Sequence, residues 1–177
     1  FYFKPRIDWE TLKKHSEGLI VLSGCLSGSF AKKLIDGNIN EAINIAKEYK
    51  EVFKENYFIE IQRLGIDLQD KINPDLIKIA HDLDIGLVAT YDVHYAEKGD
   101  HKLQEVLWSI ADGKTLDDPT RRIANTQNAY LKTEEEIADD FKDIPEAIEN
   151  TQRIFDMIED FDITFGRLEP NYTGIPK

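Results

Sequence analysis

The stretch LVATYDVH (residues 87–94) joins a short apolar run to a pair of polar side chains. Gly86 stands before it, and residues 87–90 have the length and composition of a buried β-strand. In extended backbone, residues two apart project to the same side, so Asp92 and His94 face one way and Val93 faces the other. The stretch therefore predicts a buried strand that ends in a carboxylate and an imidazole.

Two similar apolar runs precede this strand. Residues 19–22 (LIVL) lead into a turn of small residues, SGCLSG, at 23–28, and residues 57–61 (YFIEI) place Glu60 and Gln62 at the end of a second strand. Helical patterns separate these runs, and such an alternation is typical of a parallel sheet. We therefore predict an α/β fold.

The helices are predicted from their end signals and apolar stripes. Asn73 and Pro74 have the pattern of an N-cap followed by a proline at the first helical position. Thr133 and Glu136 have the spacing of a capping box. Helices are predicted for residues 9–15, 30–35, 40–53, 74–83, 101–110, 134–141 and 145–158.

The net charge of −12 is concentrated in one segment. Residues 133–162 hold twelve acidic and two basic residues, which contributes −10, and the rest of the chain holds 22 acidic and 20 basic residues. A protein that grips a nucleic-acid backbone over its whole surface needs an excess of Lys and Arg, so this composition disfavours that class. It does not exclude transient binding of a DNA end by the residues outside 133–162, whose charge is nearly neutral.

The cysteine content and the length of the apolar runs limit where the protein can function. The single cysteine, Cys25, excludes an internal disulfide framework and favours a reducing cytoplasm. No apolar run approaches the ~20 residues that a membrane span needs. The chain begins at Phe1 rather than at Met, and we expect it to be a piece of a longer protein.

Three strand ends offer polar side chains, and the carboxyl ends of parallel strands are where ligands gather. Cys25 follows the first strand, Glu60 lies at the end of the second, and Asp92 and His94 follow the third. A thiolate, an imidazole and a carboxylate together suit zinc or a similar borderline divalent ion.

Simpler interpretations remain open for each residue. Cys25 could be a small buried filler, and Asp92 could cap a turn beside an exposed His94. His15 and His81 are predicted as helix-surface residues and His101 as a solvated helix start. The acidic cluster at 134–136 is predicted as a solvated N-terminal turn that the helix dipole favours.

Several motifs together resemble a known family. Residues 17–28 (EGLIVLSGCLSG), 57–62 (YFIEIQ) and 87–95 (LVATYDVHY), followed by DGKTLDDP at 112–119 and DIPEAIENT at 143–151, resemble the PHP (polymerase and histidinol phosphatase) domain of the bacterial DNA polymerase III alpha subunit. The resemblance covers nearly the whole chain, in order and at compatible spacing.

The resemblance implies the latter portion of a distorted (βα)7 barrel with a multinuclear metal site at its strand ends. It carries metal ligation over to Cys25, Asp92 and His94, with zinc, manganese or magnesium in the full-length protein. It implies DNA-directed DNA synthesis by the parent protein, and a PHP site linked to metal-dependent 3′–5′ exonuclease proofreading. The implied partners are DNA, the separate proofreading exonuclease and the sliding clamp.

The sequence also differs from this family at several positions. The family usually has Asn where Tyr91 stands and His where Gln104 stands, and its His-x-His ligands belong before Phe1. We therefore expect no catalytic residue set in the 177-residue chain by itself, and an incomplete barrel that self-associates through exposed strand edges.

The predicted organisation has three parts. Residues 1–132 form the C-terminal portion of the PHP barrel, 133–166 an acidic helical segment, and 167–177 a linker toward a polymerase palm. The main alternative function is a non-catalytic docking module that steadies the polymerase and binds its proofreading subunit. An unrelated sugar-phosphate or amidohydrolase-like barrel would need another set of strand-end ligands.

Overall fold

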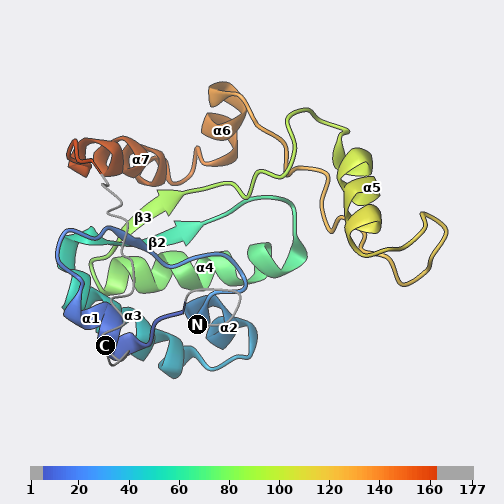
Figure 1. Ribbon diagram of the computed structural model, residues 1–177. Coiled ribbons are helices and arrows are strands. Elements are labelled where there is room, and N and C mark those ends of the chain that lie inside the picture. Colours follow the sequence, from blue (N-terminus) through green and yellow to red (C-terminus); the bar gives the residue numbers. More distant parts are fainter. Residues whose placement is uncertain (1–5, 163–177) are drawn as a thin grey trace, which may run out of the picture.

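The computed structural model describes residues 6–162, which fold around a small parallel sheet. The sheet has the order β1 (Val21–Leu22), β2 (Tyr57–Ile61), β3 (Gly86–Ala89), which confirms the α/β class and the parallel pairing (Figure 1). The helical elements are α1 (Trp9–Lys14), α2 (Ser29–Ile35), α3 (Ile39–Phe53), the 3-10 helix η1 (Lys54–Asn56), α4 (Asp67–Asp82), α5 (His101–Ala111), α6 (Glu134–Asp140) and α7 (Pro145–Met157).

The central strand β2 organises the core. It pairs with both neighbours, with Tyr57 opposite Val21 and Ile59 opposite Leu87. Tyr57, Ile59 and Ile61 are almost completely buried and share one apolar cluster with residues of α3 and α4. Because parallel strands need crossover connections, α3 and α4 return the chain to the start of the next strand and cover the sheet as they do so (Figure 1).

Helix α7 packs along β3. The Asn150 Nδ2 donates a 2.7 Å hydrogen bond to the Leu87 carbonyl oxygen, and the Arg153 guanidinium lies 5.5 Å from the centroid of the Phe58 ring. Phe58 itself is completely buried and covers Gly86. The C-terminal part of the acidic segment is therefore attached to the sheet.

The start of α4 differs from the sequence-based prediction. The helix begins at Asp67, so Pro74 lies inside it and Asn73 is not its N-cap. The Asn73 side chain is buried and donates a 3.0 Å hydrogen bond to the Gln62 carbonyl oxygen, and the Gln69 side chain accepts one of 3.0 Å from the Leu64 amide. These contacts with the chain after β2 stabilise the two turns of α4 that precede Pro74. They do so although Pro74 has no amide hydrogen and cannot donate a backbone hydrogen bond within the helix.

The first strand is shorter than predicted. Only Val21 and Leu22 pair with β2, whereas Leu19 is 40% exposed and its carbonyl oxygen accepts a 3.2 Å hydrogen bond from the Asn56 side chain. A side-chain amide thus takes the place of a strand partner before Val21. The capping box at Thr133 and Glu136 is confirmed, while the predicted linker at 167–177 lies outside the described residues.

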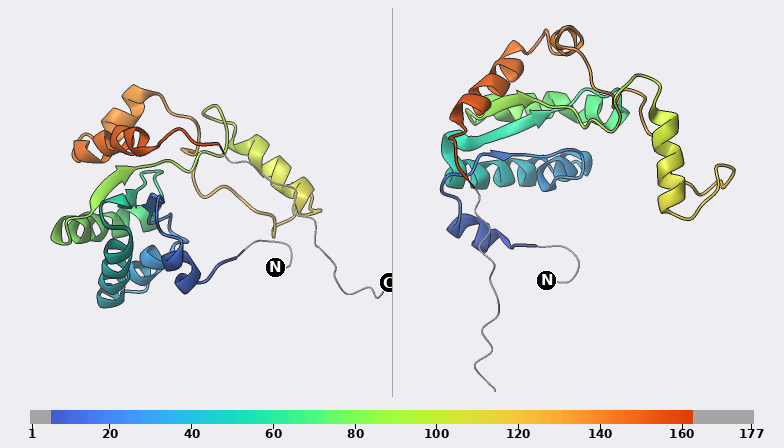
Figure 2. Two further views of the ribbon diagram at one scale, coloured as in Figure 1. Left: turned by 60° about the vertical axis from the view of Figure 1, so that its left-hand side comes forward. Right: turned by 45° about the horizontal axis from the view of Figure 1, so that its top comes forward.

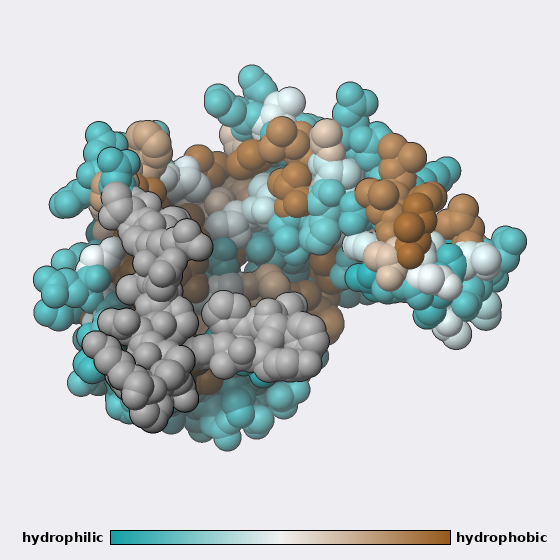
Figure 3. All heavy atoms as spheres, viewed as in Figure 1, coloured by the Kyte–Doolittle hydropathy of each residue, from teal (hydrophilic) through white to brown (hydrophobic). Residues whose placement is uncertain are grey.

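Helix α5 lies at one end of the molecule, apart from the helices that cover the sheet (Figures 1 and 2). Its side chains at Leu103, Leu107 and Ile110 are about two thirds exposed, and Figure 3 shows hydrophobic atoms gathered over this helix. Among residues 6–162, no helix has both the length and the apolar character to cross a membrane.

The packing of Phe58 on Gly86 generates a stability prediction. A methyl group at position 86 would lie 2.7 Å from Phe58 Cδ1, so Gly86→Ala should lower the free energy of unfolding by about 1–3 kcal/mol. In a Phe58→Leu background the ring is gone, and the same substitution should cost less. Urea denaturation of the four proteins measures both costs, and equal costs would contradict the contact.

Candidate functional site

The three residues predicted as metal ligands line one pocket. Cys25, Asp92 and His94 surround a cavity of about 160 Å³ at the carboxyl ends of the strands. Gln62 and Thr126 also contribute to its wall. The sheet register therefore brings together side chains that lie 69 residues apart in the sequence, from Cys25 to His94.

The turn after β1 places Cys25. The Ser23 amide donates a 3.0 Å hydrogen bond to the Phe58 carbonyl oxygen, and the Ser23 hydroxyl accepts one of 3.0 Å from the Glu60 amide. Gly28 closes the turn with a 2.8 Å bond to the Cys25 carbonyl oxygen, and a side chain at position 28 would lie 2.7 Å from the Ser23 carbonyl oxygen. Glycine is needed here because the turn folds back on itself, and Cys25 is left half-buried.

The chain after β3 holds Asp92 and His94 near each other. The His94 Nδ1 lies 2.8 Å from the Asp92 carbonyl oxygen and 3.8 Å from its carboxylate Oδ1. A proton on Nδ1 can be donated to that carbonyl, which leaves the Nε2 lone pair for a ligand. The His94 amide donates a 2.8 Å hydrogen bond to the Ala129 carbonyl oxygen, and its ring meets Trp108 edge-on at 6.3 Å.

Glu60 is a further candidate at the same edge. It lines a small recess together with Cys25 and Gln62. Burial raises the pKa of its carboxyl, hydrogen bonds from Thr90 and the Gly24 backbone oppose the shift, and the charge of Asp92 adds to it. Sequence reasoning marked Glu60 at this strand end but left it out of the ligand set, because the family resemblance carried metal ligation over only to Cys25, Asp92 and His94.

The donor atoms fit a divalent metal ion by their chemical kind. Thiolate sulfur, imidazole nitrogen and carboxylate oxygen are ligands that zinc and related ions accept. Within residues 6–162, no three His, Cys, Asp or Glu side chains form a group close enough to hold an ion. The arrangement is thus a shared pocket with suitable donors, and not a preformed coordination shell.

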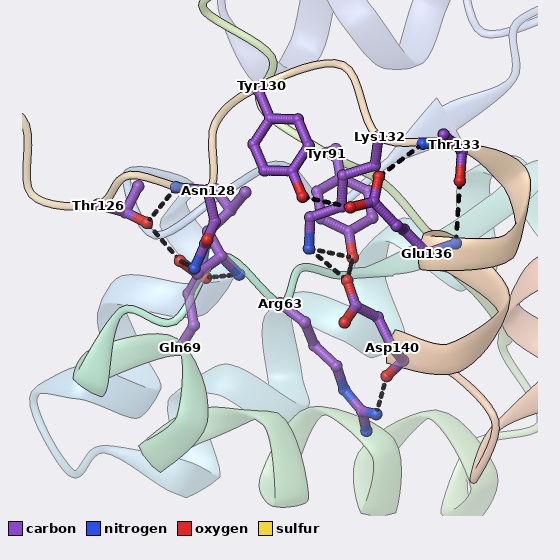
Figure 4. A network of polar contacts seen from close by, with 11 residues as sticks. Arg63, Gln69, Tyr91, Thr126, Asn128, Tyr130, Lys132, Thr133, Glu136 and Asp140 are labelled. Carbon is purple, nitrogen blue, oxygen red and sulfur yellow. Dashed lines mark hydrogen bonds and ion pairs between the residues drawn. The ribbon is translucent and has the colours of Figure 1, made fainter. Parts of the chain in front are cut away.

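A polar network joins the segments that follow β2 and β3 to α6 (Figure 4). The Tyr91 hydroxyl and the Lys132 ammonium both donate to the Asp140 carboxylate, and Arg63 donates to the Asp140 carbonyl oxygen. Burial acts to raise the pKa of Asp140, but the hydrogen bonds from Lys132 and Tyr91 outweigh it and lower the value. Burial, reinforced by the bond to Asp140, raises the pKa of Tyr91.

Two predictions about polar residues need correction. Glu136 is not simply solvated, because it accepts a 2.6 Å hydrogen bond from the Tyr130 hydroxyl as well as bonding the Thr133 amide. His101 begins α5 as predicted, but the residue is half-buried and its Nδ1 has no hydrogen-bond partner within residues 6–162, so this helix start is only partly solvated. The Glu136 contact with Tyr130 and the burial of the His101 ring nitrogen both arise from the folded chain and are not visible in the local sequence pattern.

Comparison with known proteins places these residues in context. Residues 1–64, which include Cys25 and Glu60, match the PHP domain family. The DNA polymerase III alpha subunit of Borreliella burgdorferi is 38% identical over 97% of this chain, and that of Treponema pallidum is 45% identical over 86%. The alpha subunit of Thermus aquaticus is 41% identical over 77%. The chain spans 15%, 13% and 11% of the lengths of these three relatives, respectively.

The ion pair between Arg63 and Asp143 generates a prediction for pH dependence. Two hydrogen bonds from Arg63, of 2.5 and 2.8 Å, lower the pKa of Asp143 to about 2. Because the folded-state pKa lies below the unfolded value of about 3.9, the contribution to stability is complete above that value and is lost as the pH falls toward about 2. The carboxylate is 60% exposed, so the contribution should not exceed about 1 kcal/mol.

Asp143→Asn should therefore flatten the plot of unfolding free energy against pH below about pH 4. Glu159→Gln, a change of an exposed carboxylate near the end of the described residues, is the control. Urea denaturation across this pH range measures both slopes, and a slope for Asp143→Asn as steep as that of the parent would contradict the prediction.

Proposed function

Because the chain belongs to the PHP-domain region of bacterial DNA polymerase III alpha subunits, we propose that it is a segment of a replicative DNA polymerase. The protein that carries it synthesises DNA on a DNA template. Its proposed partners are DNA, the proofreading exonuclease and the sliding clamp, and its proposed location is the cytoplasm. The identity of 38–45% to these alpha subunits over most of the chain supports this assignment.

Within that polymerase, the proposed role of the pocket is to hold divalent metal ions for phosphodiester hydrolysis. Cys25 offers a thiolate, Asp92 a carboxylate, and His94 the Nε2 nitrogen that its Nδ1 contact leaves free. A bound zinc, manganese or magnesium ion would supply Lewis-acid polarisation of the phosphodiester and a more acidic water molecule. The shared pocket of these three side chains is the observation that carries the proposal.

The reaction proposed for the full-length protein is 3′–5′ exonuclease proofreading. The isolated chain is proposed to be inactive, since its donors do not converge on one point within residues 6–162. Completion of the site by further ligands fits the proposed (βα)7 barrel, of which β1, β2 and β3 would be adjacent strands. The proposed division into a barrel portion (1–132), an acidic helical segment (133–166) and a linker (167–177) belongs to the same hypothesis.

A non-catalytic docking module is the second candidate function. The observation in its favour is the exposed apolar face of α5, formed by Leu103, Leu107 and Ile110. Such a face is typical of helices that bind another protein. In this alternative the chain steadies the polymerase and binds the proofreading subunit, and the pocket needs no metal.

Metal content separates the two candidates. In the full-length alpha subunit, Cys25→Ser, Asp92→Asn and His94→Ala should each lower the tightly bound metal measured by plasma emission spectrometry. Loss of a protein ligand should weaken metal affinity by at least about tenfold, since changes of supporting residues alone cost about that much. His15→Ala, at the exposed residue that caps the end of α1, is the control. Unchanged metal in all three site variants would favour the docking module.

Activity of the isolated chain provides a second test. The purified 177-residue protein should show no metal-dependent release of nucleotides from the 3′ end of single-stranded DNA. A measurable rate that disappears in His94→Ala would show that the chain alone holds a complete site.

A further inference from the structure

The strand end that carries Asp92 and His94 is attached to α6 through one carboxylate. Asp140, the last residue of α6, accepts hydrogen bonds from the Tyr91 hydroxyl and the Lys132 ammonium on the same oxygen, Oδ2. The Lys132 nitrogen also lies 3.4 Å from the Tyr91 hydroxyl and 4.7 Å from the centre of its ring. Three side chains from three separate segments therefore meet at one point (Figure 4).

The same residue also holds the neighbouring strand end. The Asp140 carbonyl oxygen accepts a hydrogen bond from Arg63, which follows β2 and also forms the paired contact with Asp143. Tyr91 follows β3 at the equivalent distance, two residues beyond the strand. Asp140 thus joins both strand ends to α6, one through its side chain and one through its backbone.

The junction of Tyr91, Lys132 and Asp140 contains a buried charge that needs a partner. The Lys132 side chain is only 8% exposed, so its ammonium needs a close counter-charge, and Asp140 supplies it. Tyr91 is half-buried, and its ring packs edge-on against the buried Phe141 at 5.9 Å. The position of the Tyr91 ring is therefore determined by packing at the ring and by hydrogen bonds at the hydroxyl.

The junction lies next to the proposed metal donors. Tyr91 is covalently adjacent to Asp92, so a fixed ring limits how the peptide that carries the Asp92 carboxylate can turn. On the other side, the His94 amide donates to the carbonyl oxygen of Ala129, three residues before Lys132. The segment 91–94 is thus held from both sides by the chain that runs into α6.

We propose that Tyr91, Lys132 and Asp140 are positioning residues for Asp92 and His94, an inference that rests on the proposed function. None of the three lines the pocket of Cys25, Asp92 and His94. They determine the positions of the Asp92 carboxylate and the His94 imidazole. The short helix α6 anchors this arrangement through Asp140. This assigns a task to part of the acidic segment, whose charge at Asp140 neutralises a buried lysine.

The test measures metal affinity and geometry, with cobalt as the probe. Co²⁺ is titrated into the metal-free full-length alpha subunit, and its visible absorption reports both affinity and coordination. Tyr91→Phe removes only a hydroxyl, and Asp140→Asn removes only a charge. Each should weaken Co²⁺ affinity about tenfold or more and alter the absorption bands, as loss of outer-shell support does in other metal sites. Circular dichroism and thermal melting verify the fold.

Two variants separate positioning from simple stability. Asp139→Asn changes the adjacent exposed carboxylate, which pairs only with Lys142 within residues 6–162, and should leave affinity within about twofold of the parent. The double variant Asp140→Asn with Lys132→Met removes the buried charge together with its counter-charge. It should recover thermal stability relative to Asp140→Asn and still bind Co²⁺ weakly.

The outcomes distinguish the two hypotheses. If Asp92→Asn and His94→Ala abolish Co²⁺ binding while Tyr91→Phe and Asp140→Asn leave affinity and spectrum unchanged, the positioning role is wrong and the metal site stands. If Asp92→Asn and His94→Ala leave Co²⁺ binding unchanged, the proposed metal site is wrong and the positioning role fails with it. If affinity in the double variant recovers together with stability, positioning is also overturned.

Discussion

The parallel register of β2 with its two neighbours is the constraint on which the rest of the structure depends. Because Ile59 pairs with Leu87 and Tyr57 with Val21, all three strands end at the same edge of the sheet. Crossover helices then have to pack on the sheet, and the burial of Ile59 and Ile61 against them makes a slip in register costly. The pocket at the strand ends is a consequence of this pairing.

The acidic segment has a more varied role than its charge indicates. Residues 133–162 carry a net −10, and several of their carboxylates are exposed. Asp140, Asp143 and Glu136, however, form specific contacts with Lys132, Arg63 and Tyr130 from other parts of the chain. Cations and hydroxyls from the nearly neutral rest of the chain thus partly match this negative charge. Through Asp140, α6 is joined to the segments that follow β2 and β3, and through Asn150, α7 is joined to β3.

The candidate metal ligands could be identified from the sequence, whereas the residues that bond to the chain around them could not. Cys25, Asp92 and His94 were identifiable as candidates because each follows an apolar run at a strand end. The residues that bond to the chain around them, such as Ser23 and Ala129, have no distinctive sequence pattern. Ser23 bonds the Glu60 amide and Ala129 bonds the His94 amide, so each acts across the sheet or between loops. Such contacts depend on distances that only the folded chain defines.

The sequence by itself determined the α/β class, the five residues of β2 and the capping box at Thr133, because these follow from local periodicity and end signals. It also placed Cys25, Asp92 and His94 after strands, where the structure brings them to one pocket. Tertiary structure decided that α4 begins at Asp67 and contains Pro74, because buried Asn73 and Gln69 bond to the chain after β2. It also decided that Lys132 is buried against Asp140. Hydrogen bonds between distant segments outweigh a local helix-start signal when they satisfy polar groups that folding has removed from water.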